Sequence, residues 1–204
     1  MKLKQILAKP AVEAAPQLLG WILCRQLPAG IVKLKIVEVE AYNQDDSASH
    51  SFRGITTRTA PMFEAGGRLY VYFTYGMHYA INIVTGPAGR GEAVLLRAAE
   101  PLQGIEIMQQ NRKITDTKKL ANGPAKLAQA LGIKDTKLSG KILNKSSSFT
   151  PKNKFSGDPG IYLEAPDKPL KPQDIIASPR IGISKAKDLP WRFYIKDCQF
   201  VSKL

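Results

Sequence analysis

Two carboxylates and a tyrosine alternate along one stretch of the chain, at Glu38, Glu40 and Tyr42. Residues two apart on a β-strand project to the same side, with Cα atoms about 6.6 Å apart, so these side chains can line one pocket. A carboxylate on an otherwise apolar strand is costly to bury unless it is paired or functional. Arg97 follows the apolar run 93–96 and is a candidate partner. The pair is therefore either a structural ion pair or part of an acid–base site, and periodicity does not choose between Glu38 and Glu40.

Aromatic side chains gather further along the chain, at Tyr70, Tyr72, Tyr75 and Tyr79. The segment 74–77 separates two strand patterns, and Gly76 can supply the positive φ that a hairpin needs. Tyr75, followed by Gly76 and Met77, is chemically suited to wedge between stacked bases. The alternative is that these aromatic residues are simply favoured in strands.

Neither histidine suggests a metal site. His50 and His78 have no cysteine or acid array at ligand spacing nearby, so we expect no metal. Asp45 and Asp46 are interpreted as part of a solvated loop rather than a cation site. The residues that could contact phosphate groups are Arg53, Arg58, Arg68 and Lys126.

The composition favours one intracellular domain that meets polyanions. The chain has 204 residues, of which 44% are hydrophobic, and a formal net charge of +13, so nucleic acid is the first partner to consider. Cys24 and Cys198 lie far apart, which predicts no disulfide framework and a reducing compartment. Lys9, Pro10 and Glu13 interrupt any signal-peptide core, and no apolar run approaches the roughly 18 residues that cross a bilayer.

Hydrophobic periodicity predicts the elements that must position these residues. The strand pattern 31–42 changes phase: Val32, Leu34 and Ile36 are its apolar set first, and Val37, Val39 and Ala41 later, which indicates either a bulge or a change from core to cleft. The segment 141–160 is predicted to be a mobile surface loop. The other predictions are helices at 11–25, from Pro101, and at 124–132, and strands at 69–73, 78–84, 93–96, 180–183 and 191–201.

Several of these segments together resemble the alkyladenine (3-methyladenine) DNA glycosylase family. The similarity runs through nearly all of the chain apart from 141–160. It is carried by Val37-Glu38-Val39-Glu40-Ala41-Tyr42, Ser49-His50-Ser51, Met62-Phe63, the run 69–77, Asn82, Ala93-Val94-Leu95-Leu96-Arg97-Ala98, Gly123-Pro124-Ala125-Lys126-Leu127, Arg180-Ile181-Gly182-Ile183 and Pro190-Trp191-Arg192-Phe193-Tyr194.

The resemblance implies an α+β fold in which residues 1–204 form a single mixed domain with a curved antiparallel sheet, flanking helices and a protruding β-hairpin. Tyr75, with Met77, would intercalate into DNA and fill the gap left by a nucleotide rotated out of the duplex. Tyr42 would stack on one face of the damaged base, and His50 with Tyr72 on the other. Asn82 would crowd the exocyclic amino group of guanine, and the candidates for DNA-backbone contacts are Arg58 and Lys126.

The resemblance also implies the chemistry. Glu40, Arg97 and the backbone carbonyl of Ile181 would hold a water against the sugar, with Glu40 as general base and without a metal or organic cofactor. The expected activity is hydrolysis of the N-glycosidic bond of alkylated or deaminated purines in duplex DNA, the first step of base excision repair, by a monomer that needs no protein partner and no membrane. A non-enzymatic nucleic-acid-binding module and a bifunctional glycosylase with strand cleavage stay open as alternatives.

Overall fold

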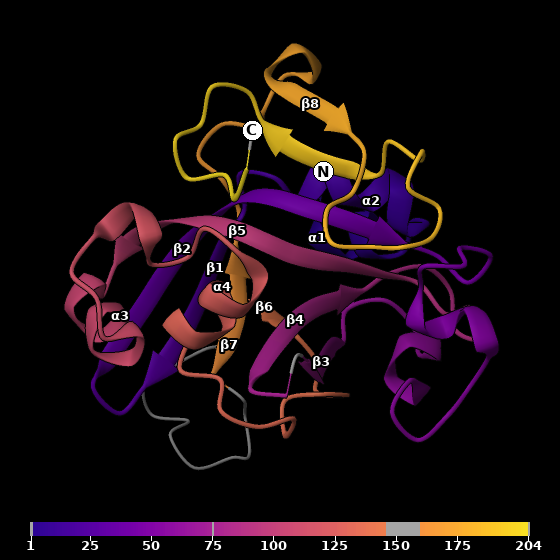
Figure 1. Cartoon of the computed structure of the whole chain (residues 1–204), viewed down its shortest axis with the longest axis horizontal. Coiled ribbons are helices and arrows are strands. Elements are labelled where there is room, and N and C mark those ends of the chain that lie inside the picture. Colours follow the sequence, from indigo (N-terminus) through magenta and orange to yellow (C-terminus); the bar gives the residue numbers. More distant parts are fainter. Residues whose placement is uncertain (1, 75, 146–159, 204) are drawn as a thin grey trace.

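A curled β-sheet runs through the molecule (Figure 1). The computed structural model describes residues 2–74, 76–145 and 160–203. Within these residues the strands follow the order β3-β4-β5-β2-β1-β7-β6, and β9 pairs with β2 and β8. The pairing is antiparallel except between β6 and β7. The strands are β1 (Ile22–Leu27), β2 (Gly30–Tyr42), β3 (Leu69–Thr74), β4 (His78–Val84), β5 (Ala93–Gln103), β6 (Asn144–Lys145), β7 (Ile161–Glu164), β8 (Ile175–Ser178) and β9 (Arg192–Ile195).

Short helices cover this sheet. In α2 the buried residues recur at helical spacing, Ala11, Ala14, Ala15 and Leu18, so one face of the helix packs against β2. On another part of the sheet, α4 packs against β4 and β5, and α3 packs against α4. The α-helices are α1 (Leu3–Leu7), α2 (Ala11–Leu18), α3 (Ile105–Arg112) and α4 (Pro124–Ala130); the 3-10 helices are η1 (His50–Arg53), η2 (Ala60–Phe63), η3 (Thr117–Lys119) and η6 (Pro172–Asp174).

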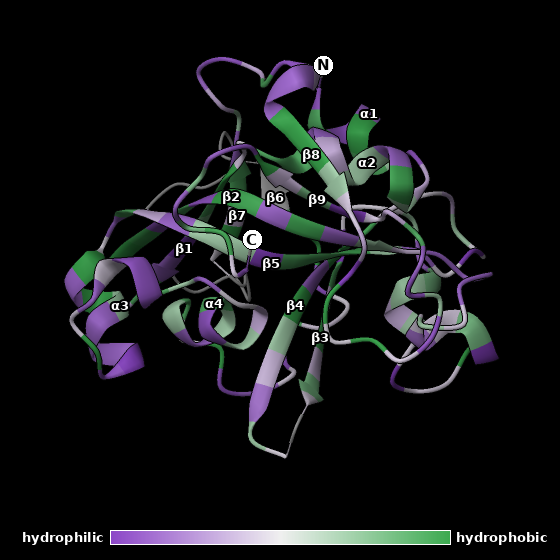
Figure 2. Ribbon diagram, turned by 45° about the horizontal axis from the view of Figure 1, so that its top comes forward, coloured by the Kyte–Doolittle hydropathy of each residue, from purple (hydrophilic) through white to green (hydrophobic). Residues whose placement is uncertain are grey.

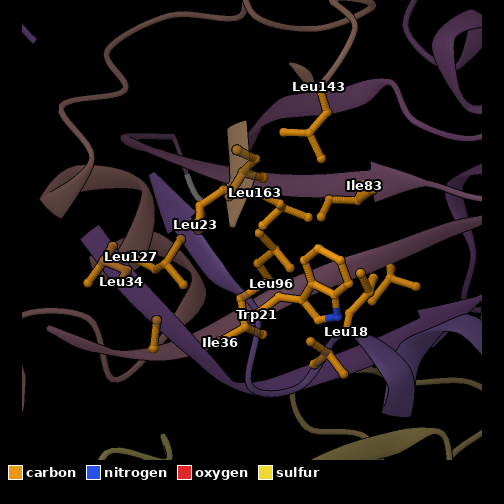
Figure 3. Close-up of a cluster of buried hydrophobic side chains, with 14 of the residues drawn as sticks. Leu18, Trp21, Leu23, Leu34, Ile36, Ile83, Leu96, Leu127, Leu143 and Leu163 are labelled. Atoms are coloured by element: carbon orange, nitrogen blue, oxygen red, sulfur yellow. The ribbon is translucent and has the colours of Figure 1, made fainter. Parts of the chain in front are cut away.

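The main hydrophobic core lies between the sheet and these helices. Leu18 of α2, Leu34 of β2, Leu96 of β5 and Leu127 of α4 are fully buried members of it. Figure 3 shows these side chains with Trp21 and others of the same cluster. Burying an aliphatic side chain of this size contributes roughly 1.5–3 kcal/mol, so the core holds the sheet and the helices together as one domain.

Paired irregularities in β2 and β5 explain the change of phase along β2. Ile36 pairs with Ala99, Glu38 with Ala98 and Val39 with Leu96, so Val37 and Arg97 are each left without a partner in this ladder. An extra residue in a strand reverses the side to which the following residues project. After the extra Val37, the residues on the core side are therefore Val39 and Ala41, which continue the face of Ile36, while Glu38, Glu40 and Tyr42 lie on the opposite side. The predicted bulge is therefore confirmed, and every residue from 36 to 41 is buried.

The hairpin formed by β3 and β4 extends away from the body of the molecule (Figure 2). Leu69 pairs with Ile83 at its base, and Thr74 pairs with His78 near its end. The side chains at the base are buried, whereas Phe73 and Met77 near the end are exposed. The predicted protruding hairpin is therefore confirmed, as is the α+β fold with a curved, mainly antiparallel sheet.

Two predicted helices were placed wrongly at one end. The helix expected over 11–25 ends at Leu18, because Gly20 has a φ of +82° and the chain then enters β1. The helix expected from Pro101 begins after Gly104 instead. Pro101 belongs to β5, where it pairs with Leu34. Among the described residues β4 pairs with 93–95 of β5 and no further, so on this side of β5 no strand pairs at Pro101, and a residue without an N–H is tolerated there.

The last predicted strands were also wrong in extent. Residues 180–183 form no strand, because their backbone turns over the end of β2 and contacts side chains there. Of 191–201 only Arg192–Ile195 is β-strand. In the segment 141–160, residues 141–143 make backbone contacts with residues 67–69, 144–145 pair with β7, and 146–159 lie outside the described residues. No helix among the described residues is both long and apolar enough to cross a membrane.

Candidate active site

A cavity of about 450 Å³ opens where β2, β3, β4 and β5 face the segment 181–185. The irregularities of β2 and β5 bring Glu40, Tyr42 and Arg97 onto the side of the sheet that faces this cavity. Every residue proposed from the sequence for catalysis or base binding lines this cavity: Glu40, Tyr42, His50, Tyr72, Asn82, Arg97 and Ile181.

Glu40 is fully buried at the floor of the cavity, and its carboxylate is held from two sides. The backbone N–H of Ile181 donates to Oε1 at 2.8 Å, and the hydroxyl of Tyr42 donates to Oε2 at 2.8 Å. Burial, with the negative charge of Glu40, raises the pKa of Tyr42, so its hydroxyl stays protonated. Each carboxylate oxygen has two lone pairs, and in the described part of the chain Oε2 has no other hydrogen-bond donor. One lone pair of Oε2 can therefore accept a proton from a bound water.

Arg97 lies beside Glu40 but contacts it loosely. Its Nη1 is 3.3 Å from Oε1 of Glu40 and donates to the carbonyl of Ile181 at 3.4 Å. The side chain is 11% exposed, so it forms part of the cavity surface. The predicted group of Glu40, Arg97 and the Ile181 carbonyl is thus brought together by β2, β5 and a segment about 140 residues further along the chain than Glu40.

Glu38 shares a face with Glu40 but does not line the cavity. Arg192 Nε donates to its Oε1 at 2.6 Å, and the backbone N–H of Ser202 donates to its Oε2 at 2.6 Å. Arg97 Nε is 3.2 Å from the same Oε1. The surroundings of the two glutamates therefore differ, because Glu38 is enclosed by cations and backbone while Glu40 faces the cavity.

His50 and two tyrosines form one wall. The imidazole lies edge-on to Tyr72, with ring centroids 4.5 Å apart, and its Nδ1 is 2.9 Å from the hydroxyl of Tyr70. Burial, and to a smaller extent the charge of Arg58, lowers the pKa of His50, while burial raises the pKa of Tyr70 to about 12. The imidazole is therefore neutral near pH 7, and its Nδ1 can accept a hydrogen bond from the Tyr70 hydroxyl, which leaves Nε2 as a donor.

The turn that carries His50 is fixed by its neighbours. Ser49 caps η1 by accepting from the N–H of Ser51, whose hydroxyl donates to the carbonyl of Gly91 at 2.7 Å. A side chain at Gly91 would come within 2.4 Å of the Ser51 Cβ, so only glycine allows this approach. On the neighbouring strand, Asn82 of β4 donates from Nδ2 to the carbonyl of Tyr70 at 3.0 Å, which fixes the plane of its amide.

An ion pair that sequence reasoning missed supports Tyr42 from outside the cavity. Arg180 and Asp46 form a fully buried pair, and the guanidinium of Arg180 lies 4.6 Å from the ring centre of Tyr42 and 5.2 Å from that of Trp191. Arg180 also donates to the carbonyl of Ala41 at 2.9 Å. The interpretation of Asp46 as part of a solvated loop was wrong, because it accepts from a buried guanidinium 134 residues away. The residue types alone gave no signal for this pairing.

Three of the residues predicted to contact DNA are described, and none of the three lines the cavity. Met77 is 71% exposed beside the hairpin end, and Arg58 is exposed in the loop between η1 and η2. Lys126 of α4 donates to Asn122 at 2.8 Å, next to Pro124 and Ala125 on the cavity rim. Burial, with the charges of Arg112 and Lys119, lowers the pKa of Lys126. Tyr75 lies outside the described residues.

Chemistry, rather than size, distinguishes this cavity. A hollow of about 610 Å³ lies between α2 and the strands β8 and β9, and no acidic, basic or histidine side chain lines it in the described part of the chain. The described residues also contain no cluster of three or more His, Cys, Asp or Glu side chains that could hold a metal ion. The Glu40 cavity instead combines a carboxylate, a guanidinium and flat aromatic rings, which suits acid–base chemistry on a planar substrate.

Comparison with known proteins identifies the family of this chain. Residues 5–199 match the model of the methylpurine-DNA glycosylase family. The chain is 47% identical over 203 residues to a Francisella tularensis subsp. tularensis protein named "Putative 3-methyladenine DNA glycosylase", with 98% of both chains covered. It is 44% identical over 200 residues to a protein of the same name from Carboxydothermus hydrogenoformans, covering 98% of this chain and 97% of the other. The chain therefore belongs to the methylpurine-DNA glycosylase family.

Proposed function

We propose that this protein is a monofunctional DNA-3-methyladenine glycosylase, which hydrolyses the N-glycosidic bond of alkylated or deaminated purines in duplex DNA. The observation that carries the proposal is the convergence of the Glu40 carboxylate, the Arg97 guanidinium and the Ile181 carbonyl at the floor of a cavity walled by aromatic rings. The family and the names of its relatives support the same substrate class. The protein would act inside the cell as a monomer.

The chemistry follows from the Glu40 carboxylate. A water held by Glu40, Arg97 and the Ile181 carbonyl attacks the anomeric carbon of the sugar, and its proton passes to Glu40. The bond between sugar and base breaks, and the base leaves with the electron pair. Positive charge builds on the sugar in this transition state, and the nearby carboxylate stabilises it. An alkylated base that is already cationic leaves as a neutral molecule, so little help from a general acid is required.

The walls of the cavity suit a base that has been rotated out of the helix. An enzyme cannot reach the sugar–base bond of a stacked nucleotide, so the base must leave the stack, at least cost when it is damaged. Tyr42 would stack on one face, with His50 and Tyr72 on the other, and Asn82 would crowd the amino group of guanine. Met77 and Tyr75 would enter the duplex, while Arg58 and Lys126 would contact its backbone.

The direct test is release of free base from duplexes that each carry one lesion. The panel contains 3-methyladenine, 7-methylguanine, hypoxanthine or ethenoadenine, and an undamaged duplex of the same sequence is the control. We expect free purine from at least one lesion and none from the control. Binding without release from any of the duplexes would instead favour the non-enzymatic module.

The same incubations separate hydrolysis from strand cleavage. A bifunctional enzyme forms a Schiff base between a lysine and the sugar, which borohydride reduces to a stable protein–DNA adduct. The described lining of the cavity includes Lys185, whereas the carboxylate at its floor suits activation of water. We expect abasic product and no trapped adduct; an adduct formed as fast as the base is released would assign the lyase alternative.

A further inference from the structure

The C-terminal segment holds Arg97 more closely than Glu40 does. Arg97 Nε donates to the hydroxyl of Ser202 at 3.1 Å and lies 3.2 Å from Glu38 Oε1. On the cavity side, the guanidinium lies 3.3 Å from Glu40 and 3.4 Å from the Ile181 carbonyl. The orientation of Arg97 is thus set from behind, by groups that do not line the cavity.

Ser202 connects Arg97 to Glu38 through a single hydroxyl. The hydroxyl accepts from Arg97 and donates to Glu38 Oε1 at 2.9 Å, and the backbone N–H of Ser202 donates to Glu38 Oε2 at 2.6 Å. One residue therefore binds both oxygens of the Glu38 carboxylate and the Nε of Arg97. Charge-assisted hydrogen bonds of this kind are stronger than neutral ones, so they hold the side chain of Arg97 in one orientation.

Packing explains why Ser202 lies at this point. Val201 is buried against Val37 and Ala98, next to the irregular part of β2 and β5. Arg192 of β9 donates to the carbonyl of Lys203 as well as to Glu38. The segment is therefore fixed on both sides of Ser202, by an apolar contact before it and a hydrogen bond after it.

We propose that Ser202 is a positioning residue for base release, which holds the guanidinium of Arg97 where it can bind the attacking water. This inference rests on the proposed function of Glu40 and Arg97. Without the Ser202 hydroxyl, the described polar contact that remains for Arg97 Nε is the one with Glu38 at 3.2 Å, and the guanidinium can turn toward Glu40. The damaged base would still bind, since Ser202 is not on the cavity wall.

The test compares Ser202→Ala with Ser202→Thr and with Ser178→Ala, by single-turnover release from a single-lesion duplex with enzyme in excess. Ser178 is the matched control, because its hydroxyl accepts from Arg192 at 3.0 Å, in the same network, and makes no described contact with Arg97. A misplacement of about 1 Å can cost roughly 10²-fold in rate, so for a smaller shift of Arg97 we expect a loss of about tenfold in Ser202→Ala. We expect Ser202→Thr to restore most of the rate and Ser178→Ala to match the wild type. The affinity of all variants for the lesion duplex should be unchanged.

Three results would overturn the inference. These are an unchanged rate in Ser202→Ala, an equal loss in Ser178→Ala, or a loss that the threonine variant does not recover. Its failure is distinct from failure of the proposed function: a wild type that releases no base from any lesion refutes both, whereas an active wild type with an equally active Ser202→Ala refutes only the positioning role.

Discussion

The floor of the cavity and the end of the β3–β4 hairpin are built in opposite ways. At the floor, Glu40 is fully buried and receives hydrogen bonds from Tyr42 and Ile181. Near the hairpin end, Phe73 and Met77 are 50% and 71% exposed. A reacting group needs a fixed geometry, whereas a group that enters DNA must be apolar and accessible before binding. The two regions should therefore fail differently when changed, one in rate or stability and the other in DNA affinity.

Replacing Glu40 with Gln should have the largest effect. The amide keeps the shape of the carboxylate but cannot take the proton of water, so the single-turnover rate of base release should fall by about 10³-fold. Affinity for the lesion duplex, measured by fluorescence anisotropy, should stay within a small factor of the wild type. A variant that releases base at an undiminished rate would remove Glu40 from the reaction.

Replacing Asp46 with Asn should mainly reduce stability. Arg180 would be left as a buried charge without its carboxylate, which costs about 3 kcal/mol. A loss of that size lowers the melting temperature of a domain this long by roughly 10 °C, which thermal unfolding would detect. The matched control is Asp45→Asn, because Asp45 is 74% exposed in its pair with Arg90 and should contribute little. Equal melting temperatures of the two variants would mean that the buried pair of Asp46 and Arg180 contributes little to stability.

Replacing Met77 with Ala should weaken DNA binding alone. Because the side chain is exposed, its loss should leave the melting temperature unchanged, while affinity for a lesion duplex falls roughly fivefold, equal to about 1 kcal/mol. With enzyme in excess, the rate of release should match the wild type. Leu102→Ala, an exposed apolar residue of β5, is the control that should keep full affinity. Unchanged affinity in both variants would exclude Met77 from the DNA interface.

The smallest expected effect concerns His50 and pH. The pKa of His50 is lowered in the folded protein, chiefly by burial. As pH falls below the ordinary pKa of histidine, the unfolded chain therefore binds the proton before the folded protein does. Stability from the neutral imidazole is therefore complete above about pH 6.5 and is lost as pH falls through the folded pKa. Between pH 7 and pH 5 the wild type should lose roughly 2 °C more in melting temperature than His50→Asn. An identical pH response would show that His50 titrates as it does in the unfolded chain.

Local patterns predicted the residues of the floor better than the contacts that hold them. Alternation in β2 put Glu38, Glu40 and Tyr42 on one face, and a charge ending an apolar run suggested Arg97. The hydrogen bond from Ile181 to Glu40 joins residues 141 apart, and that from Ser202 to Glu38 joins residues 164 apart. Such contacts depend on the path by which the chain returns over the sheet, and the hydrophobic periodicity of a segment does not predict that path. Resemblance to the family supplied Ile181, but neither route identified Asp46 with Arg180, or Ser202.

The unpaired Val37 and Arg97 also limit how the length of this chain can change. Deleting one residue from 36–40 would turn either the apolar or the acidic side chains of β2 to the opposite face, because side chains alternate strictly along a strand. A substitution there alters one contact, whereas a gain or loss of one codon exchanges the core with the cavity floor. In this strand, the number of residues is therefore under tighter constraint than the identity of most of its side chains.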